Sequence, residues 1–500
     1  MKPPEENNTN SSNSNSSTIN TLTKENATES NSIQIPEISL PKGGGALKGI
    51  DEKFEVNSAN GTAGFSIPLP ITPGRNGFSP SLALSYNSGG GNSPYGLGWD
   101  VGIPAIQRKT DKRLPRYRDG SDEDIFMFSG AEDLVPFLNE VASGDWQTIE
   151  HRDGDYRVER YRPRIEGGFA RIEKISHPVH GVYWKITTPD NTATIFGRNT
   201  NARIADPEDD TRIFQWLPEF SYDDKGNWIK YEYKEEDLEN VPNALHEKNR
   251  WNGTAKFTNK YLKRVKHGNR SPYYADPVRP YDPQPPAQEE HFFELVFDYG
   301  EHDAAIPTPD EAVNQSWNYR PDAFSHYRAG FEIRTNRLCK CILMFHHFKE
   351  EADFGENYLV RSLNLAYESS SKDTPQKSEV TYLKSITQTG YIRKPDNTYS
   401  GKSLPPMEFE YQQLNWSREI KSVSKENIVN APVGLTNNYQ WVDLYGEGIS
   451  GILTEQGEGW FYKSNLGDVD EDGDVRFTAA KEVIPRPSFA GLSTGALSIQ

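Results

Sequence analysis

An acidic stretch near the end of the sequence, GDVDEDGDV, has the residue types that bind a metal ion. Asp468, Asp470 and Asp472 alternate and a glycine follows, as at the start of a calcium-binding loop, while Asp474 adds another carboxylate. An EF-hand loop also needs a bidentate acid at its twelfth position, which here is Ala479. We therefore expect no firm metal site and no other cofactor. The stretch is either a low-affinity calcium site or the solvated tip of an acidic hairpin.

A second acidic turn lies in QWVDLYGEGISGIL, Gln440 to Leu453. The segment resembles a propeller repeat of the FG-GAP type, whose acidic loop often binds calcium. Tyr445 stands where such a loop has an acid, which leaves Asp443 and Glu447 as its carboxylates. Two acids make a poor cage for a hard cation. We expect a structural turn there and no metal.

Two glycine-rich stretches, Gly43–Gly49 and Gly89–Gly98, could in principle bind phosphate. Neither has the G-x-x-x-x-G-K-[ST] pattern or the spacing of a dinucleotide-binding loop, and neither is followed by a helical pattern. Glycine also permits turns and a close approach of backbones. We expect turns between strands, with Tyr95 and Trp99 packing beside Gly98, and we expect Gly98→Val to disrupt folding.

Pairs of residues that could carry catalysis are few. Glu408 and Glu410 have the spacing of the paired glutamates of ADP-ribosyltransferases, but the Ser-Thr-Ser strand and the NAD-binding arginine that should precede them are not recognisable. His346 and His347 are adjacent on a strand pattern, so they point to opposite faces. No Ser-His-Asp set and no H-E-x-x-H motif appears. We assign no catalytic or cofactor-binding residue and expect no enzyme activity in this chain.

The two cysteines, Cys339 and Cys341, are two positions apart. On a strand they would share one face, and the loop between them is too tight for an easy disulfide. We expect buried, reduced thiols.

Composition favours an all-β protein. Of the 500 residues, 12% are aromatic, and 40 Gly and 34 Pro provide many turns. A net charge of −17 disfavours nucleic acid as a partner. No apolar run of about 18 residues and no Sec-type signal peptide is visible. If the protein leaves the cell, another route must carry it.

The elements that must position these residues are strands in three regions. Residues 1–36 form an Asn/Ser-rich tail that we expect to be disordered. Residues 37–425 alternate apolar and polar side chains, as in FFELVFDYG, and predict a large antiparallel sheet. SYDDKGNWIKYEY resembles the Tyr-Asp repeat of RHS proteins. Residues 426–500 carry Trp- and Gly-rich strand signals at wider spacing and predict the first blade or blades of a β-propeller.

Four blocks together resemble the SpvB/TcdB family, in particular the N-terminal part of the B component of bacterial insecticidal Tc toxin complexes. They are Ser39–Tyr117, Phe126–Phe137, His326–Phe348 and Tyr439–Gly467. The resemblance implies a virulence protein that helps a C component form a hollow β-shell around a toxic polypeptide. A propeller then gates the shell and docks onto the pore-forming A component.

The family has a second branch, which remains the alternative. In SpvB itself, a similar region precedes a proline linker and a domain that ADP-ribosylates actin. We favour the first branch because the chain runs directly from the SpvB-like region into propeller-like sequence. One and a fraction blades cannot close a propeller. We therefore expect this chain to be the N-terminal part of a longer protein.

Overall fold

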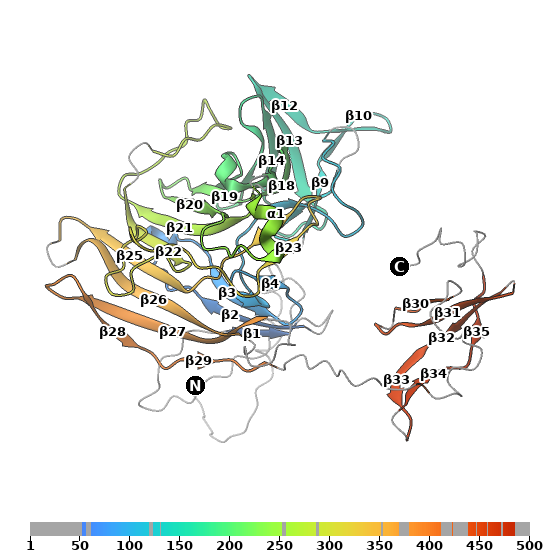
Figure 1. The fold of residues 1–500 in the computed structure, drawn as a ribbon. Helices are drawn as coiled ribbons and strands as arrows, with labels where there is room; N and C mark the ends of the chain where they lie inside the picture. Colours follow the sequence, from blue (N-terminus) through green and yellow to red (C-terminus); the bar gives the residue numbers. More distant parts are fainter. Residues whose placement is uncertain are drawn as a thin grey trace, which may run out of the picture. The chain divides into compact units, whose positions relative to one another are not determined.

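The computed structural model is an all-β protein, as the composition predicts (Figure 1). The chain divides into two compact units, Met1–Tyr411 and Gln412–Gln500. The expected tail, residues 1–36, lies outside the described residues. The structure describes residues 53–56, 62–119, 124–130, 132–252, 257–286, 290–351, 354–369, 380–411, 423, 439–446, 448–457, 459–471 and 474–485.

The first unit begins with a small antiparallel sheet of four strands, in the order β1-β2-β3-β6. Phe65, Tyr86 and Trp99 lie side by side across it. Apolar residues alternate along β2 and β3, so Ile67 and Leu84 are fully buried on one face. The bounds are β1 (Lys53–Val56), β2 (Ala63–Pro68), β3 (Ala83–Asn87) and β6 (Trp99–Val101), with the short pair β4 (Asn92–Ser93) and β5 (Gly96–Leu97) before β6.

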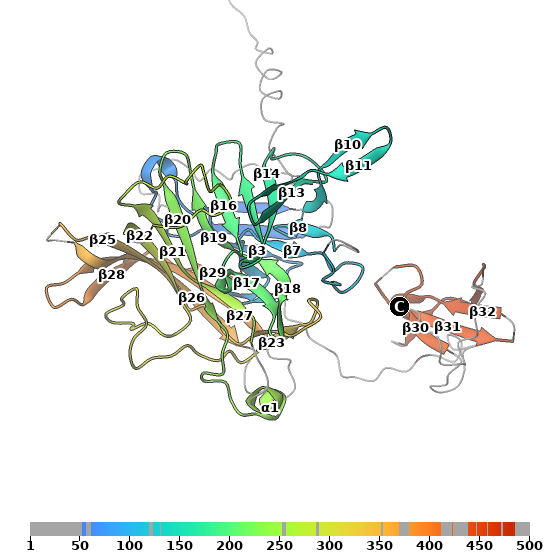
Figure 2. The same cartoon turned by 90° about the horizontal axis from the view of Figure 1, so that it is seen from above.

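The large antiparallel sheet, which the alternating pattern predicts, has 19 strands (Figures 1 and 2). Its strands are β7 (Ile106–Arg108), β8 (Phe126–Phe128), β9 (Glu132–Pro136), β12 (Glu150–Asp153), β13 (Tyr156–Pro163), β14 (Arg171–His177), β15 (Gly181–Thr187), β16 (Ala193–Phe196), β17 (Arg203–Asp206), β18 (Asp209–Trp216), β19 (Pro218–Tyr222), β20 (Trp228–Glu235), β21 (Lys260–Asn269), β22 (His291–Asp298), β25 (Cys341–Phe348), β26 (Gly355–Ser369), β27 (Thr381–Arg393), β28 (Tyr399–Ser403) and β29 (Met407–Glu408).

Short elements decorate the connections. Two separate hairpins are β10 (Leu138–Ala142) with β11 (Asp145–Thr148), and β23 (Phe324–His326) with β24 (Ile333–Thr335). The helical elements of the described residues are α1 (Lys248–Trp251) and the 3₁₀ turns η1 (Arg75–Gly77), η2 (Thr200–Ala202) and η3 (Leu245–Glu247).

One part of the large sheet curls around a core of its own. β7, β8 and β9 follow one another, β9 pairs with the end of β13, and β7 pairs with β18. Their inward side chains form a buried aromatic cluster in which Phe126 packs edge-on to Trp184 at 5.0 Å and to Trp216 at 5.8 Å. The rings fill the space that the curled strands enclose.

The remainder of the large sheet, β20 to β27, packs against the small sheet. Ile67 and Leu84 join Leu295, Met344 and Ile386 in one buried cluster. This sandwich is the principal core of the first unit. Residues about 300 positions apart in sequence meet in it, as in the hydrogen bond from Trp99 Nε1 to the Tyr411 hydroxyl, where the separation is 312.

The second unit contains a four-stranded antiparallel sheet in the order β30-β31-β32-β35 and a hairpin of β33 and β34. Val442, Leu453, Trp460 and Tyr462 form its apolar cluster. One such sheet has the strand number of one propeller blade, and the propeller itself remains a prediction. The bounds are β30 (Tyr439–Val442), β31 (Gly451–Gln456), β32 (Gly459–Lys463), β33 (Asn465–Val469), β34 (Val475–Phe477) and β35 (Lys481–Glu482).

Candidate functional site

A cavity of about 400 Å³ lies between the small sheet and the large sheet of the first unit. Its lining residues come from β6, β7, β18, β21, the segment after β22 and the β23–β24 hairpin. They include Asp100, Tyr299, Phe324 and Arg328. Its walls therefore come from segments that only the folded chain brings together.

Asp100 is a titratable group of this cavity lining. Its side chain is exposed, although the protein surrounds it on several sides. This desolvation raises the pKa of Asp100 to about 6, and a hydrogen bond from the Val101 N–H opposes the rise. A carboxyl with such a pKa can exchange a proton near neutral pH, and the neighbouring His326 has a lowered pKa because of burial and Arg328.

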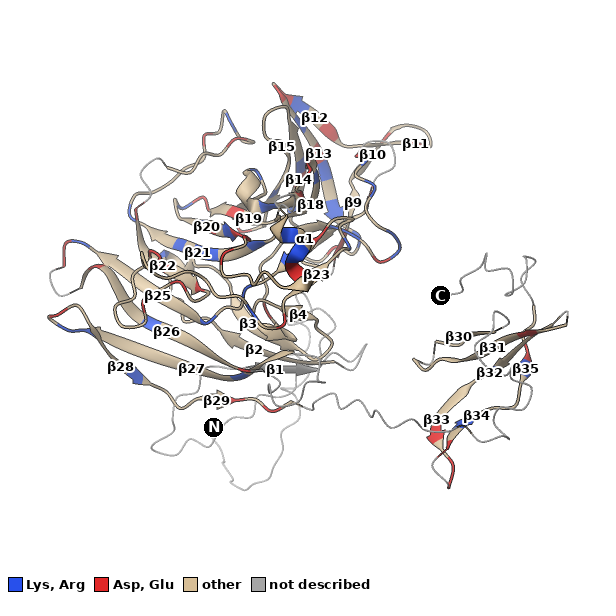
Figure 3. Cartoon of the chain, in the orientation of Figure 1, with Lys and Arg blue, Asp and Glu red and all other residues tan. Residues whose placement is uncertain are grey.

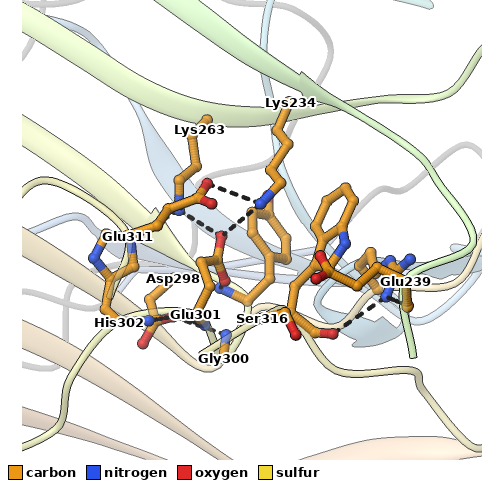
Figure 4. A network of polar contacts seen from close by, with 12 residues as sticks. Lys234, Glu239, Lys263, Asp298, Gly300, Glu301, His302, Glu311 and Ser316 are labelled. Atoms are coloured by element: carbon orange, nitrogen blue, oxygen red, sulfur yellow. Dashed lines mark hydrogen bonds and ion pairs between the residues drawn. The ribbon is translucent and has the colours of Figure 1, made fainter. Parts of the chain in front are cut away.

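A network of buried charges holds the long connection between β22 and β25 (Figure 4). Lys263 Nζ donates to Glu301 Oε1 at 2.5 Å, to the Phe297 carbonyl at 3.1 Å and to His302 Nε2 at 2.8 Å. His302 Nδ1 must carry the ring proton, because it faces the Thr308 carbonyl at 3.0 Å. The ring is thus neutral, and burial lowers the pKa of both His302 and Lys263.

The same network fixes the cavity wall. Glu301 Oε2 accepts from the Tyr299 N–H at 2.8 Å, and the Tyr299 hydroxyl donates to the Leu262 carbonyl at 3.0 Å. Asp298 Oδ1 accepts from the N–H groups of Gly300 and Glu301. All three donor directions of the Lys263 ammonium are occupied, so the network positions the backbone and offers no free amine for chemistry.

A second buried ion pair anchors the same connection between β22 and β25. Arg337 Nε donates to Glu236 Oε1 at 2.8 Å, and the guanidinium lies 4.2 Å above the Trp317 ring. Burial raises the pKa of Glu236, and Arg337 and the Tyr261 hydroxyl oppose that rise. Removing one member of such a pair leaves an uncompensated buried charge.

The acidic stretch of the second unit forms the tip of the β33–β34 hairpin. Asp468 pairs with Arg476 at 3.2 Å, and Asp470 Oδ1 accepts from the Asp474 N–H at 2.8 Å. Asp472 lies outside the described residues. Within the part of the chain that is described, no group of three or more His, Cys, Asp or Glu side chains is placed to hold a metal ion. Because Asp472 is not among the described residues, calcium binding at this hairpin tip stays a prediction.

The second acidic turn is held by its own backbone. Asp443 Oδ2 accepts from the Gly448 N–H at 2.6 Å. Glu447 lies outside the described residues. The Asp443 carboxylate thus closes the turn, in line with the structural role expected for it.

The glycine-rich stretch before β6 is a turn, as predicted. The Gly98 N–H donates to the Gly91 carbonyl at 2.9 Å, and Gly98 has a φ of +78°. Tyr95 and Trp99 on either side are buried. The stretch therefore serves as a turn around the short strands β4 and β5, whereas Gly43–Gly49 lies outside the described residues.

The remaining candidate pairs are the two glutamates and the two histidines. Glu408 and Glu410 are exposed, while Phe409 between them packs against the core. His346 Nε2 lies 2.7 Å from Thr72 Oγ1, whereas His347 Nε2 lies 3.1 Å from Glu294 Oε2, so the two rings have different partners, as predicted.

Cys339 and Cys341 are buried and reduced, as expected, but they do not share a face. Cys339 belongs to the core between the sheets, and Cys341 packs in the cluster on the other side of the large sheet. The prediction of one shared face was wrong because β25 begins at Cys341, so strand alternation does not extend back to Cys339.

Sequence reasoning missed the charged networks and the cavity. Lys263 and His267 lie on a strand pattern, YLKRVKHGN, whose charges resemble those of a solvated face. The available signal was that Lys263 and His267 share the alternation of the apolar Val265, but the partners Glu301 and His302 come from an irregular segment. Among the described residues, no helix has the length and apolar character needed to cross a membrane.

Comparison with known proteins places these features among bacterial toxins. The family profile described as Salmonella virulence plasmid 65kDa B protein (SpvB) matches residues 57–348. The curated relative Mono(ADP-ribosyl)transferase SpvB of Salmonella choleraesuis (strain SC-B67) is 35% identical over 370 residues, which cover 72% of this chain and 58% of the relative. The chain thus spans little more than half the length of that relative.

Two solved structures resemble this one closely. The crystal structure of TcdB2-TccC3 matches 92% of this chain and 21% of its own chain, with 31% identity and a TM-score of 0.68. The N-terminal domain of the effector protein SpvB from Salmonella typhimurium strain LT2 matches 65% of this chain and 98% of its own, with 34% identity and a TM-score of 0.55.

Proposed function

This chain belongs to the SpvB family, as an N-terminal region of the SpvB/TcdB toxin type, and from this we propose that it is a non-catalytic component of a secreted Tc-type toxin complex. Residues 37–425 form part of the wall of a hollow β-shell, completed by an RHS-type C component, that encloses a toxic polypeptide. Residues 426–500 begin a propeller that gates the shell and docks to the pore-forming A component. The assembly acts outside the bacterial cell.

The extent of the TcdB2-TccC3 match is the observation that favours this function. The first unit holds 411 of the 500 residues, so an alignment over 92% of the chain must reach into Gln412–Gln500. The SpvB N-terminal domain aligns with only 65% of the chain, even though 98% of that domain is used. The TcdB2-TccC3 structure thus matches more of this chain than the structure of the SpvB N-terminal domain does, and more than the 72% that the sequence match to SpvB covers.

The physical character of the first unit suits a container wall. Its 19-stranded sheet joins strands that are distant in sequence through continuous backbone hydrogen bonds, which resist local bending. Buried ion pairs fix the irregular connections on the sheet instead of lining an open catalytic cleft. Rigidity and a closed surface are the properties that a shell requires.

Co-expression with an RHS-type C component tests the proposal. We expect the two chains to co-elute in size-exclusion chromatography, and we expect the C-terminal part of the C component to resist protease until the complex is denatured. Separate elution together with unprotected cargo would refute the shell role.

A second candidate function rests on the name of the curated relatives, Mono(ADP-ribosyl)transferase SpvB. In that case this region would deliver a catalytic domain encoded in the same gene. The test is transfer of labelled ADP-ribose from NAD to actin by the complete gene product. Transfer would favour this second function over the first.

A further inference from the structure

The hairpin of β10 and β11 projects from the first unit (Figure 2). It forms a separate two-stranded sheet, and its base is joined to β13 through the backbone of Phe137, Ile149 and Arg160. All five residues of β10 are exposed, as are Asp145, Trp146 and Gln147 of β11. An isolated two-stranded hairpin is at best marginally stable in water. The chain itself thus gives this hairpin little support.

Three large apolar side chains of the hairpin face solvent. The exposed fraction is 45% for Leu138, 54% for Val141 and 57% for Trp146. Tryptophan is the residue most enriched at the energetic centre of protein interfaces. Three such side chains on one short hairpin form an exposed apolar surface of the kind that a partner protein buries.

The strand register places two of these side chains on one face. Leu138 lies opposite Thr148 and Glu140 lies opposite Trp146, so Leu138 and Trp146 are diagonal neighbours on the same face. The register then shifts between Glu140 and Ala142, which makes Val141 part of a β-bulge. A bulge re-aims its side chain and increases the local twist. The hairpin therefore presents a compact surface centred on Trp146.

The charge of the hairpin indicates the kind of partner. Glu140 and Asp145 lie within it, and no Lys, Arg or His occurs from residue 132 to residue 150 (Figure 3). The whole chain carries a net charge of −17, so a second copy would bring like charges together at this tip. Charge complementarity favours a basic partner surface.

We propose that the hairpin Leu138–Thr148 is a docking element that inserts Trp146 into an apolar pocket, ringed by Lys and Arg, on the C component. Trp146 and Leu138 supply the buried contact, while Asp145 and Glu140 meet cationic side chains at the rim. The inference rests on the proposed function for the existence of an assembly, and it adds the surface through which the chain engages a partner.

The test compares Trp146→Ala with Phe169→Ala, whose ring is also exposed, at 76%, but lies outside the hairpin. Affinity for the co-expressed C component is measured by biolayer interferometry, and folding by the thermal midpoint. We expect Trp146→Ala to weaken binding about 30-fold or more, as at an interface hot spot. Phe169→Ala should bind like the unchanged chain.

A charge variant keeps the proposal falsifiable if Trp146→Ala disturbs the hairpin. Asp145→Lys retains the indole and should weaken binding about 3- to 10-fold at low salt, with the difference shrinking at 0.5 M salt because exposed charges are screened. Equal affinity of both hairpin variants and the unchanged chain would overturn the inference and leave the shell role standing.

Failure of the unchanged chain to bind the C component would instead count against the proposed function. The same variants are then measured against the A component and for self-association by sedimentation. Loss of binding to the A component or loss of a dimer on Trp146→Ala, or no effect in either assay, overturns the proposed partner.

Discussion

Replacing Gly98 by alanine should destabilise the first unit strongly. Gly98 has a φ of +78°, a conformation that costs an L-residue about 1–2 kcal/mol. A Cβ added there would lie 2.6 Å from Tyr86 Cε2 and 3.0 Å from the Asn87 carbonyl oxygen. Overpacking of this kind costs about 1–3 kcal/mol. We expect a total loss of about 2–5 kcal/mol, and Gly98→Val should lose more.

The Tyr86 ring cannot relieve this overlap cheaply. It packs against Trp99 at 5.3 Å and Tyr411 at 6.1 Å, so moving it disturbs the core between the two sheets. The Asn87 oxygen is backbone and belongs to β3. The structure thus holds both obstacles in place.

Gly91→Ala is the matched control because it changes the same turn by the same atom. Its added Cβ would meet nothing within 4 Å, and its φ is not in the left-handed region. Urea denaturation followed by tryptophan fluorescence compares the midpoints of the two variants and the unchanged chain. A Gly98→Ala midpoint equal to that of Gly91→Ala would refute the account of this turn.

Three other outcomes are expected. Glu301→Gln should lower the free energy of unfolding by about 3–5 kcal/mol, because Lys263 would stay buried without its counter-charge. Glu311 is more exposed, so Glu311→Gln should lower it by less than about 1 kcal/mol in the same urea assay, and equal losses would contradict this account. Burial lowers the pKa of His267 and His346 to about 4 and that of His291 to about 3, so the folded state binds fewer protons than the unfolded state. Their stabilising contribution is present above about pH 6.5 and is lost as the pH falls toward 3–4; His291→Leu should reduce the resulting fall in thermal midpoint between pH 7 and 4.5, and a fall of unchanged size would contradict the assignment. Burial also raises the pKa of the Cys339 and Cys341 thiols, so iodoacetamide should label neither in the native protein and both in urea, as read by intact mass; labelling of the native protein would show that the thiols are accessible.

Residue patterns predicted the elements of this fold where a single rule, such as strand alternation or the conformational freedom of glycine, determines the local structure. Phe293, Leu295 and Phe297 alternate along their strand, and all three pack in or against the core between the sheets. The turn at Gly98 follows from the conformational freedom of glycine. The cysteines show where the rule stops: alternation places side chains only within a strand, and the sequence does not mark Cys341 as the first residue of one.

The networks and the hairpin surface depend on contacts that no local pattern encodes. Lys263 meets Glu301 only because the connection after β22 folds back across β21. Asp100 has an ordinary place in an alternating strand, and the cavity that it lines is built from strands that are distant in sequence. In the sequence, Trp146 resembles any other aromatic residue of a predicted strand. The separate hairpin that leaves it exposed is visible only in three dimensions.

The sandwich of the two sheets also sets a demand on synthesis in the cell. The small sheet is made first, yet its apolar face is covered by Leu383 and Ile386, and Trp99 bonds to Tyr411, 312 residues later. At about 5–20 residues per second, a ribosome needs about 15–60 s to supply that cover. During this interval the nascent chain exposes the apolar face of the small sheet and unpaired strand edges, both of which favour aggregation. Slow translation at low temperature would prolong this exposure, so chaperone supply is the natural variable for obtaining the protein in soluble form.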